Sequence, residues 1–370
     1  MAASGSVASD VKDLFRLSVP VISTTAIQQA SRLICIAWLG RLGSPDYVGA
    51  AVLGFVVCNV TGNSLAFGFC TALDAFVSQA YGSRQYRLMG LYTQRVIAMM
   101  TIASVPVIFI WCQTEFVLHE YLFIQRDIAH LAGSWSKVIA IGLWPNLIHE
   151  ILRKYLQGGR VLWPVLLSTL VNAVAVLAGN LLYVEHLGLG FRGVALAFVT
   201  GQWAALVALA ATIVLRKRHL RVKLDKLRSK CGRRGQEIEL ASALSVAAGD
   251  DDEEEGGEDK NDEERPLATA DAMSPSTSAS SALDDAWSRL DDWPPLQPSG
   301  PYSVFSGWVP ILQLGVPGAM SLCVEWGSFE LVAGIAGQLG PLPLSVHGVL
   351  MNTASTFICS PRASRTRRGP

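Results

Sequence analysis

The sequence predicts an all-α polytopic membrane protein with a complete six-helix N-lobe, followed by the first two helices of a second, repeat-related lobe. Half of the residues (51%) are hydrophobic, only 16% are charged, and the mean hydropathy is +0.35. The apolar residues form stretches of about 20 or more, the length that crosses a bilayer. Charge gathers in one central region and between the stretches, so nucleic acid is not an expected partner.

Eight apolar stretches give the expected division of the chain. Six lie at 17–39, 48–73, 88–112, 131–152, 163–184 and 193–215, and two more at 308–340 and 344–360. We therefore expect a 1–16 cytoplasmic tail, a 17–215 six-helix transmembrane N-lobe, a 216–305 disordered charged cytoplasmic loop, a 306–360 segment with the first two C-lobe helices, and a 361–370 basic tail.

Lysine and arginine set the expected orientation. Three connections on one side are basic, through Lys12, Arg16, Arg84, Arg87, Arg153, Lys154 and Arg160. The alternate connections carry only Arg41, Arg126 and Arg192. Cytoplasmic connections collect Lys and Arg, so we expect the N-terminal tail and the 216–305 loop to be cytoplasmic.

The central loop changes composition sharply. A basic run (RKRHLRVKLDKLRSKCGRR) precedes an acidic run (DDDEEEGGEDKNDEE) and a Ser/Thr/Ala/Pro-rich stretch. Blocks of like charge stay solvated because they bury little apolar surface. We interpret the loop as a linker, with membrane lipid headgroups as an alternative partner of the basic run.

An internal repeat relates the seventh stretch to the first. Residues 14–20 (LFRLSVP) lie over 311–317 (ILQLGVP) without gaps. In the same register, residues 39–43 (LGRLG) lie over 336–340 (AGQLG). Two copies packed together with a site between them are a common plan for transporters.

Two carboxylates, Glu325 and Glu330, lie well inside the seventh stretch. A charge at the centre of a spanning helix costs ~3 kcal/mol on insertion scales and usually has a function. We expect no other span to carry a carboxylate at comparable depth. The remaining helices should then build a cavity in which these acids take up and release protons.

Several runs resemble the multidrug and toxic compound extrusion (MATE) family, eukaryotic type. They are NVTG at 59–62, FGFCTALDAFVSQAYGSRQYRLMGLYTQR at 67–95 and CVEWGSFELVAGIAGQLG at 323–340. The resemblance covers 14–216 and 306–357. It implies a fold of twelve helices in two lobes, with this chain truncated after the eighth helix. It also implies export of organic cations or other amphiphiles in exchange for protons or sodium.

The resemblance also implies site residues. Glu325 matches the cation- and proton-binding glutamate of eukaryotic members, Glu330 a second acid of that helix, and Asn59 a polar residue facing the cavity. Bacterial members carry an aspartate in the first helix; that position lies near Cys35 here, so this route is expected to be absent. Arg32 departs from the family pattern.

Gln28, Asn63 and Trp326 are further candidates for lining the cavity. Polar groups inside spans need partners, so hydrogen bonding between helices explains Gln28, Asn59 and Asn63 equally well. Trp326 could face an organic cation or simply pack between helices. No GxxxxGK[ST] motif is present, which argues against an ATP-driven pump.

These observations favour a secondary antiporter, not an enzyme, in the plasma membrane or a vacuolar or other endomembrane. The expected substrate is a small organic cation, drug or amphiphile. No cofactor is expected, and a proton gradient is the driving force, with sodium as an alternative. Two other classes remain open: a flippase for lipid-linked oligosaccharides, and a non-transporting truncated fragment or partner of a full-length transporter.

Overall fold

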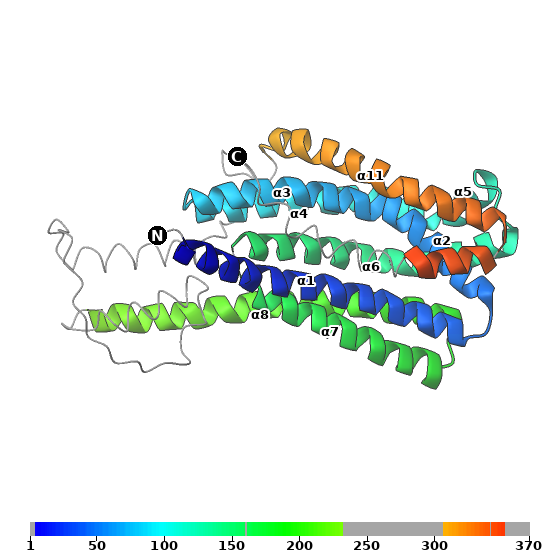
Figure 1. Cartoon of the computed structure of the whole chain (residues 1–370), viewed down its shortest axis with the longest axis horizontal. Coiled ribbons are helices and arrows are strands. Elements are labelled where there is room, and N and C mark those ends of the chain that lie inside the picture. The colour runs from blue at the N-terminus through cyan, green and yellow to red at the C-terminus, as the bar shows by residue number, and fades with distance from the viewer. Residues whose placement is uncertain (1–3, 160, 232–305, 341, 352–370) are drawn as a thin grey trace.

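The computed structural model describes residues 4–159, 161–231, 306–340 and 342–351, and every regular element among them is helical (Figure 1). The elements are α1 (Ser4–Arg41), α2 (Pro45–Cys58), the π-helical η1 (Asn59–Asn63), α3 (Ser64–Gly82), α4 (Tyr86–Cys112), α5 (Thr114–Glu120), α6 (Arg126–Gly158), α7 (Trp163–Asn180), the π-helical η2 (Leu181–His186), α8 (Gly190–Cys231) and α11 (Val309–Gln338). A short apolar helix, Leu342–Met351, follows α11.

Five helical segments of the described chain are long and apolar enough to cross a membrane. They are Pro45–Gly82, Tyr86–Cys112, Trp163–His186, Gly190–His219 and Val309–Gln338. The predicted all-α, multi-pass membrane protein is therefore confirmed. Two predicted stretches are not among the five: 17–39 lies within α1 and 131–152 within α6. Polar residues interrupt the apolar sequence of both, such as Gln28 and Arg32 in α1 and Lys137 and Asn146 in α6.

Three predicted segments, the 216–305 loop, the eighth apolar stretch and the 361–370 tail, lie partly or wholly outside the described residues. The loop expected from residue 216 begins as helix, because α8 continues to Cys231. Its remainder at 232–305 lies outside the described residues. So do the end of the predicted eighth stretch and the 361–370 tail.

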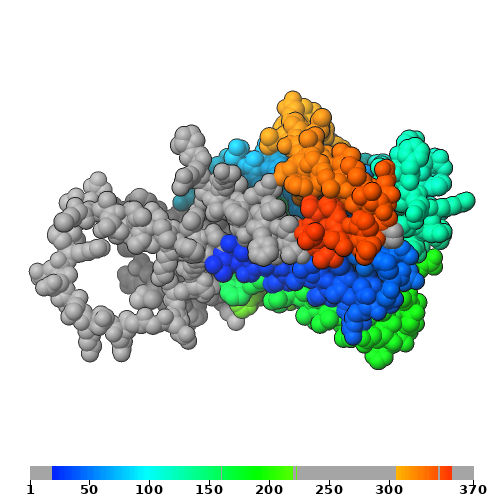
Figure 2. Space-filling model, turned by 45° about the vertical axis from the view of Figure 1, so that its right-hand side comes forward, coloured from blue at the N-terminus to red at the C-terminus, as the bar shows by residue number. Residues whose placement is uncertain are grey.

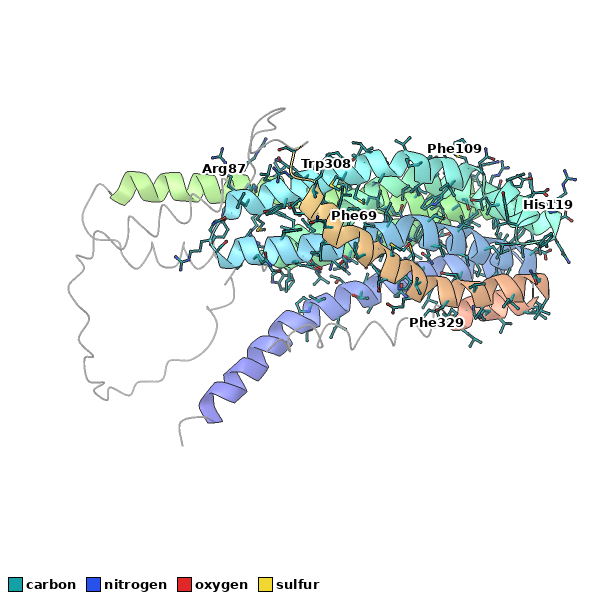
Figure 3. The ribbon with its side chains drawn as sticks, turned by 90° about the horizontal axis from the view of Figure 1, so that it is seen from above. Phe69, Arg87, Phe109, His119, Trp308 and Phe329 are labelled. Atoms are coloured by element: carbon teal, nitrogen blue, oxygen red, sulfur yellow. The ribbon has the colours of Figure 1, made fainter. Side chains whose placement is uncertain are left out.

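Most of the long helices run side by side along the long axis of the molecule (Figure 1), while the first part of α1 leaves the bundle at an angle (Figure 3). α7 packs against α8 and α1, while α6 contacts α2, α4 and α8. α11 lies along α3, although these two helices are far apart in the sequence. In the space-filling view α11 and the Leu342–Met351 helix, in orange and red, cover part of one face (Figure 2).

Two apolar clusters fill the interior. One gathers Leu39, Leu53, Trp111 and Trp135 with residues of α6 up to Leu147. The other gathers side chains from α3, the first half of α4, the end of α6 and the start of α11, including Phe69, Leu73, Met100, Ile151 and Ile311. The polar residues of η1 interrupt the first cluster, which includes Cys58 before the turn and Ala66 after it.

The π-helical η1 is held by Trp111 of α4. The indole Nε1 of Trp111 donates a hydrogen bond to Thr61 Oγ1 at 2.8 Å. A Cβ on Gly62 would lie 2.5 Å from Trp111 Cζ2, so only glycine lets the ring approach this closely. Single π-helical turns within α-helices are frequent at functional sites, and here the turn contains Asn59 and Asn63.

Small residues let α11 approach α3 closely. A Cβ on Gly68 would lie 2.3 Å from the Cα of Ala319, and one on Gly315 would lie 2.8 Å from Phe69 Cδ1. Such small-residue contacts are typical of helix pairs in membranes. The opposite side of α11 is apolar and exposed, as at Val324 and Leu331. Phe329 also lies on the outer side of the helix (Figure 3).

Candidate functional site

A carboxylate and an amide meet where α11 crosses η1. Asn59 Nδ2 donates a hydrogen bond to Glu330 Oε1 at 3.0 Å. The two residues are 271 positions apart in the sequence, so the contact depends on the docking of α11. On the same helix, the thiol of Cys323 lies 3.0 Å from Ser64 Oγ and links α11 to the start of α3.

Glu330 and Asn59 line a cavity of about 110 Å³. Arg32 of α1 and His347 of the Leu342–Met351 helix supply its other charged or titratable groups. Val52, Phe55 and Val56 of α2 form an apolar wall. The Leu342–Met351 helix lies close to that wall, since a Cβ on Gly348 would lie 2.2 Å from Val52 Cγ2.

A chain of amides extends from Glu330 into the N-lobe. Asn63 Nδ2 donates to Asn59 Oδ1 at 2.9 Å, and Asn146 Nδ2 of α6 donates to Asn63 Oδ1 at 3.3 Å. Each amide therefore donates in the direction of the Glu330 carboxylate. The predicted candidates Asn59 and Asn63 thus lie together, and only Asn59 lines the cavity.

Glu325 and Trp326 lie on α11 but outside the lining of this cavity. Glu325 is half-buried, and its backbone carbonyl accepts a hydrogen bond from Ser328 Oγ at 2.7 Å. The Trp326 ring meets Phe67 of α3 edge to face, with 5.4 Å between ring centroids. In this structure Trp326 therefore contributes to helix packing.

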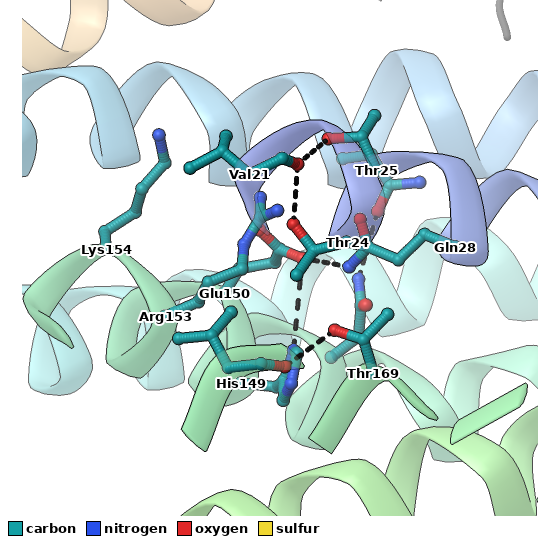
Figure 4. Close-up of polar contacts among 12 residues, drawn as sticks. Val21, Thr24, Thr25, Gln28, His149, Glu150, Arg153, Lys154 and Thr169 are labelled. Carbon is teal, nitrogen blue, oxygen red and sulfur yellow. Dashed lines mark hydrogen bonds and ion pairs between the residues drawn. The ribbon is translucent and has the colours of Figure 1, made fainter. Parts of the chain in front are cut away.

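Glu150 of α6 is a second buried acid, near the end of the predicted 131–152 stretch. Its side chain is only 4% exposed. It forms an ion pair with Arg153, one turn along the same helix. Gln28 Nε2 of α1 donates to Glu150 Oε1 at 3.3 Å (Figure 4). The candidate Gln28 therefore contacts this second acid and does not line the cavity of Glu330.

The residues around Glu150 tie α6 to two more helices. His149 Nε2 lies 3.1 Å from Ser168 Oγ of α7. Lys154 Nζ lies 2.6 Å from Asp74 Oδ2 of α3. Successive polar side chains of one α6 segment thus contact α1, α3 and α7, so this segment acts as a fixed polar centre of the N-lobe.

The sequence did not identify Arg32, His347, Asn146 or Glu150 as site residues. Arg32 carried a signal, because a charged side chain inside a span seldom lacks a function. Glu150 carried the same signal within the 131–152 stretch. Asn146 and His347 are also polar residues inside predicted stretches, but their partners could not be identified because the contacts cross the bundle. No group of three or more His, Cys, Asp or Glu suited to a metal exists within the described ranges.

The fold and site define a class: a multi-pass helical membrane protein with a charged pocket between packed spans. Comparison with known proteins agrees with the predicted resemblance. A family model described as MatE matches residues 20–182. Over these residues the chain is similar to the multidrug and toxic compound extrusion (MATE) family, as the resemblance of its motifs predicted.

Among curated relatives, Protein DETOXIFICATION 16 of Arabidopsis thaliana is 33% identical over 55% of this chain and 42% of its own length. Protein DETOXIFICATION 52 of the same plant is 22% identical over 95% of this chain and 55% of its own length. Multidrug and toxin extrusion protein 2 of Oryctolagus cuniculus is 22% identical over 95% of this chain and 46% of its own length. The chain spans about half the length of these relatives.

Two solved structures share the fold. The eukaryotic MATE transporter AtDTX14 gives a TM-score of 0.67 at 20% identity, covering 96% of this chain and 63% of that one. An inward-facing multidrug resistance MATE family transporter gives a TM-score of 0.60 at 13% identity, covering 93% of this chain and 63% of that one. The predicted fold class is therefore confirmed, while the division into lobes remains a prediction.

Proposed function

We propose that this chain belongs to an efflux transporter that moves small organic cations across a membrane in exchange for protons. The observation that carries the proposal is the Glu330 carboxylate, held by Asn59 in a cavity between membrane-spanning helices. Relatives named for multidrug and toxin extrusion or for detoxification support efflux as the process. Proton coupling rests on the chemistry of the carboxylate.

The mechanism is competition between two cations for one acid. When Glu330 is ionised, its charge attracts an organic cation, and Asn59 satisfies one of its oxygens. Protonation neutralises the carboxylate and removes that attraction, so the organic cation leaves. Because the ligand shifts an equilibrium only through its differential affinity, exchange requires cation and proton to exclude each other at this group.

We assign the main role to Glu330 and a supporting role to Glu325. Glu330 lines the cavity and accepts a hydrogen bond from the facing segment, whereas Glu325 lies outside the cavity lining. The resemblance to the family ranks the two acids the other way round. Substitution of each acid in turn therefore decides between the geometry and the resemblance.

One alternative has a specific observation in its favour. Only 11% of the most apolar 18-residue stretch of α11 is buried, compared with 67% of the corresponding stretch of the Pro45–Gly82 segment. A cavity wall with so little covering fits a chain that binds cations but needs further helices for transport. In that case the chain would act as a partner of a full-length transporter.

The test is uptake of radiolabelled tetramethylammonium into liposomes that contain the purified chain, with the lumen more acidic than the medium. Proton antiport predicts uptake above that of empty vesicles and its collapse when a protonophore removes the gradient. Binding without uptake would support the alternative. If the chain shows no uptake and no binding, both proposals are refuted.

A further inference from the structure

Arg32 is the charged residue of the cavity that the proposed exchange does not use. It lies in α1, lines the same cavity as Glu330, and is half-buried. Its guanidinium interacts electrostatically with the Glu330 carboxylate. Arginine keeps its charge under all physiological conditions, so the cavity always contains a cation belonging to the protein itself.

The position of Arg32 is set from the neighbouring turn of α1. Gln28 lies four residues earlier, and residues four apart share a face of a helix. Gln28 donates its hydrogen bond to Glu150, which is itself fixed by Arg153. One face of α1 therefore contacts the polar centre of α6 and presents Arg32 to the cavity.

We propose that Arg32 is a tethered counter-cation that sets the cation specificity of the Glu330 site. In the empty site it neutralises the carboxylate, and an incoming organic cation must displace it. This inference rests on the proposed function, since it takes Glu330 as the acid that binds the cation. It concerns binding alone and does not require transport.

The physical reason is competition at short range. A carboxylate buried without a partner is costly, so a resident arginine stabilises the empty pocket. The same arginine weakens binding of any second cation, because like charges then share one small cavity. A ligand must offset the loss of the Arg32–Glu330 attraction, which makes the site selective for cations that bind Glu330 strongly.

The experiment measures tetramethylammonium binding to the purified full chain by isothermal titration calorimetry at fixed pH and salt. This compact permanent cation suits a cavity of about 110 Å³. Arg32→Gln should tighten binding five- to tenfold, about 1 kcal/mol for one partly solvated ion pair. Arg32→Lys keeps the charge and should stay within about twofold of the wild type.

Arg41→Gln is the matched control. Arg41 lies on the same helix, and its side chain is 70% exposed beside Glu185. This substitution removes the same charge outside the cavity and should leave the dissociation constant unchanged. Equal tightening in Arg41→Gln and Arg32→Gln would reduce the effect to net charge and overturn the proposal.

A double-variant cycle separates this inference from the proposed function. Glu330→Gln should weaken binding, and Arg32→Gln should tighten binding less in this background than in the wild type, because only the like-charge repulsion remains to be relieved. If Glu330→Gln leaves binding unchanged, the proposed function fails at its site. If Glu330→Gln weakens binding but Arg32→Gln does not tighten it, only the tethered cation fails.

Discussion

The close approach of α11 to α3 is the condition for the Glu330 site, and Gly68 tests it. Its Cβ position lies 2.3 Å from both the Cα and N of Ala319. These are backbone atoms, so a side chain at 68 cannot be accommodated by a rotamer change. Reaching an ordinary contact distance requires the helices to separate by roughly 1 Å.

Gly68→Val should therefore destabilise the docked helix by about 1–3 kcal/mol, the usual cost of overpacking. A shift of roughly 1 Å would also stretch the 3.0 Å hydrogen bond between Asn59 and Glu330 beyond bonding distance. The assay is thermal unfolding in detergent together with tetramethylammonium binding. Both the unfolding midpoint and the affinity should fall.

Gly327→Val is the matched control for this prediction. Gly327 lies on α11, the helix that Gly68 of α3 contacts, and a Cβ on Gly327 meets nothing within 4 Å among the described residues. The control should keep wild-type binding. If Gly68→Val retains wild-type stability and affinity, the docking of α11 on α3 is not what the structure indicates.

Two further predictions concern charge. Glu150→Leu leaves Arg153 buried without its partner and should destabilise the chain by about 3 kcal/mol, whereas the double variant Glu150→Leu with Arg153→Leu should recover most of this loss. Thermal unfolding of both variants measures the difference. Equal stability of the single and double variants would show that the pair is not coupled. Protease added outside intact cells should spare tags placed at the N-terminus and in the 216–305 loop, because the Lys/Arg asymmetry predicts both to be cytoplasmic; cleavage of either tag would refute this orientation.

The fold was predictable because membrane helices carry their signal locally. Apolar length and basic connections identify spans without knowledge of their partners. The long apolar runs at 88–112 and 308–340 accordingly correspond to α4 and α11. The π-helical turn at Asn59–Asn63 was not predicted, because it depends on Trp111 packing from another helix.

The site was predictable only in part. Glu330 and Asn59 could be nominated from the sequence, but their contact joins segments 271 residues apart. Glu150 was overlooked because its neighbour Arg153 made the region read as a basic connection, while its partner Gln28 lies 122 residues away. Arg32 was visible as a departure from the family pattern, and only the structure brings it beside Glu330 in one cavity.

The most direct test of the account is the pH dependence of tetramethylammonium binding in the wild type, Glu330→Gln and Glu325→Gln. Protonation of a carboxylate removes its charge, so wild-type affinity should fall as the pH is lowered. Glu330→Gln should bind weakly at every pH and lose most of this dependence, with His347 as the remaining titratable group of the cavity, while Glu325→Gln should retain most of both. A Glu330→Gln variant with wild-type affinity and an unchanged pH profile would contradict the assignment of Glu330 as the exchange site.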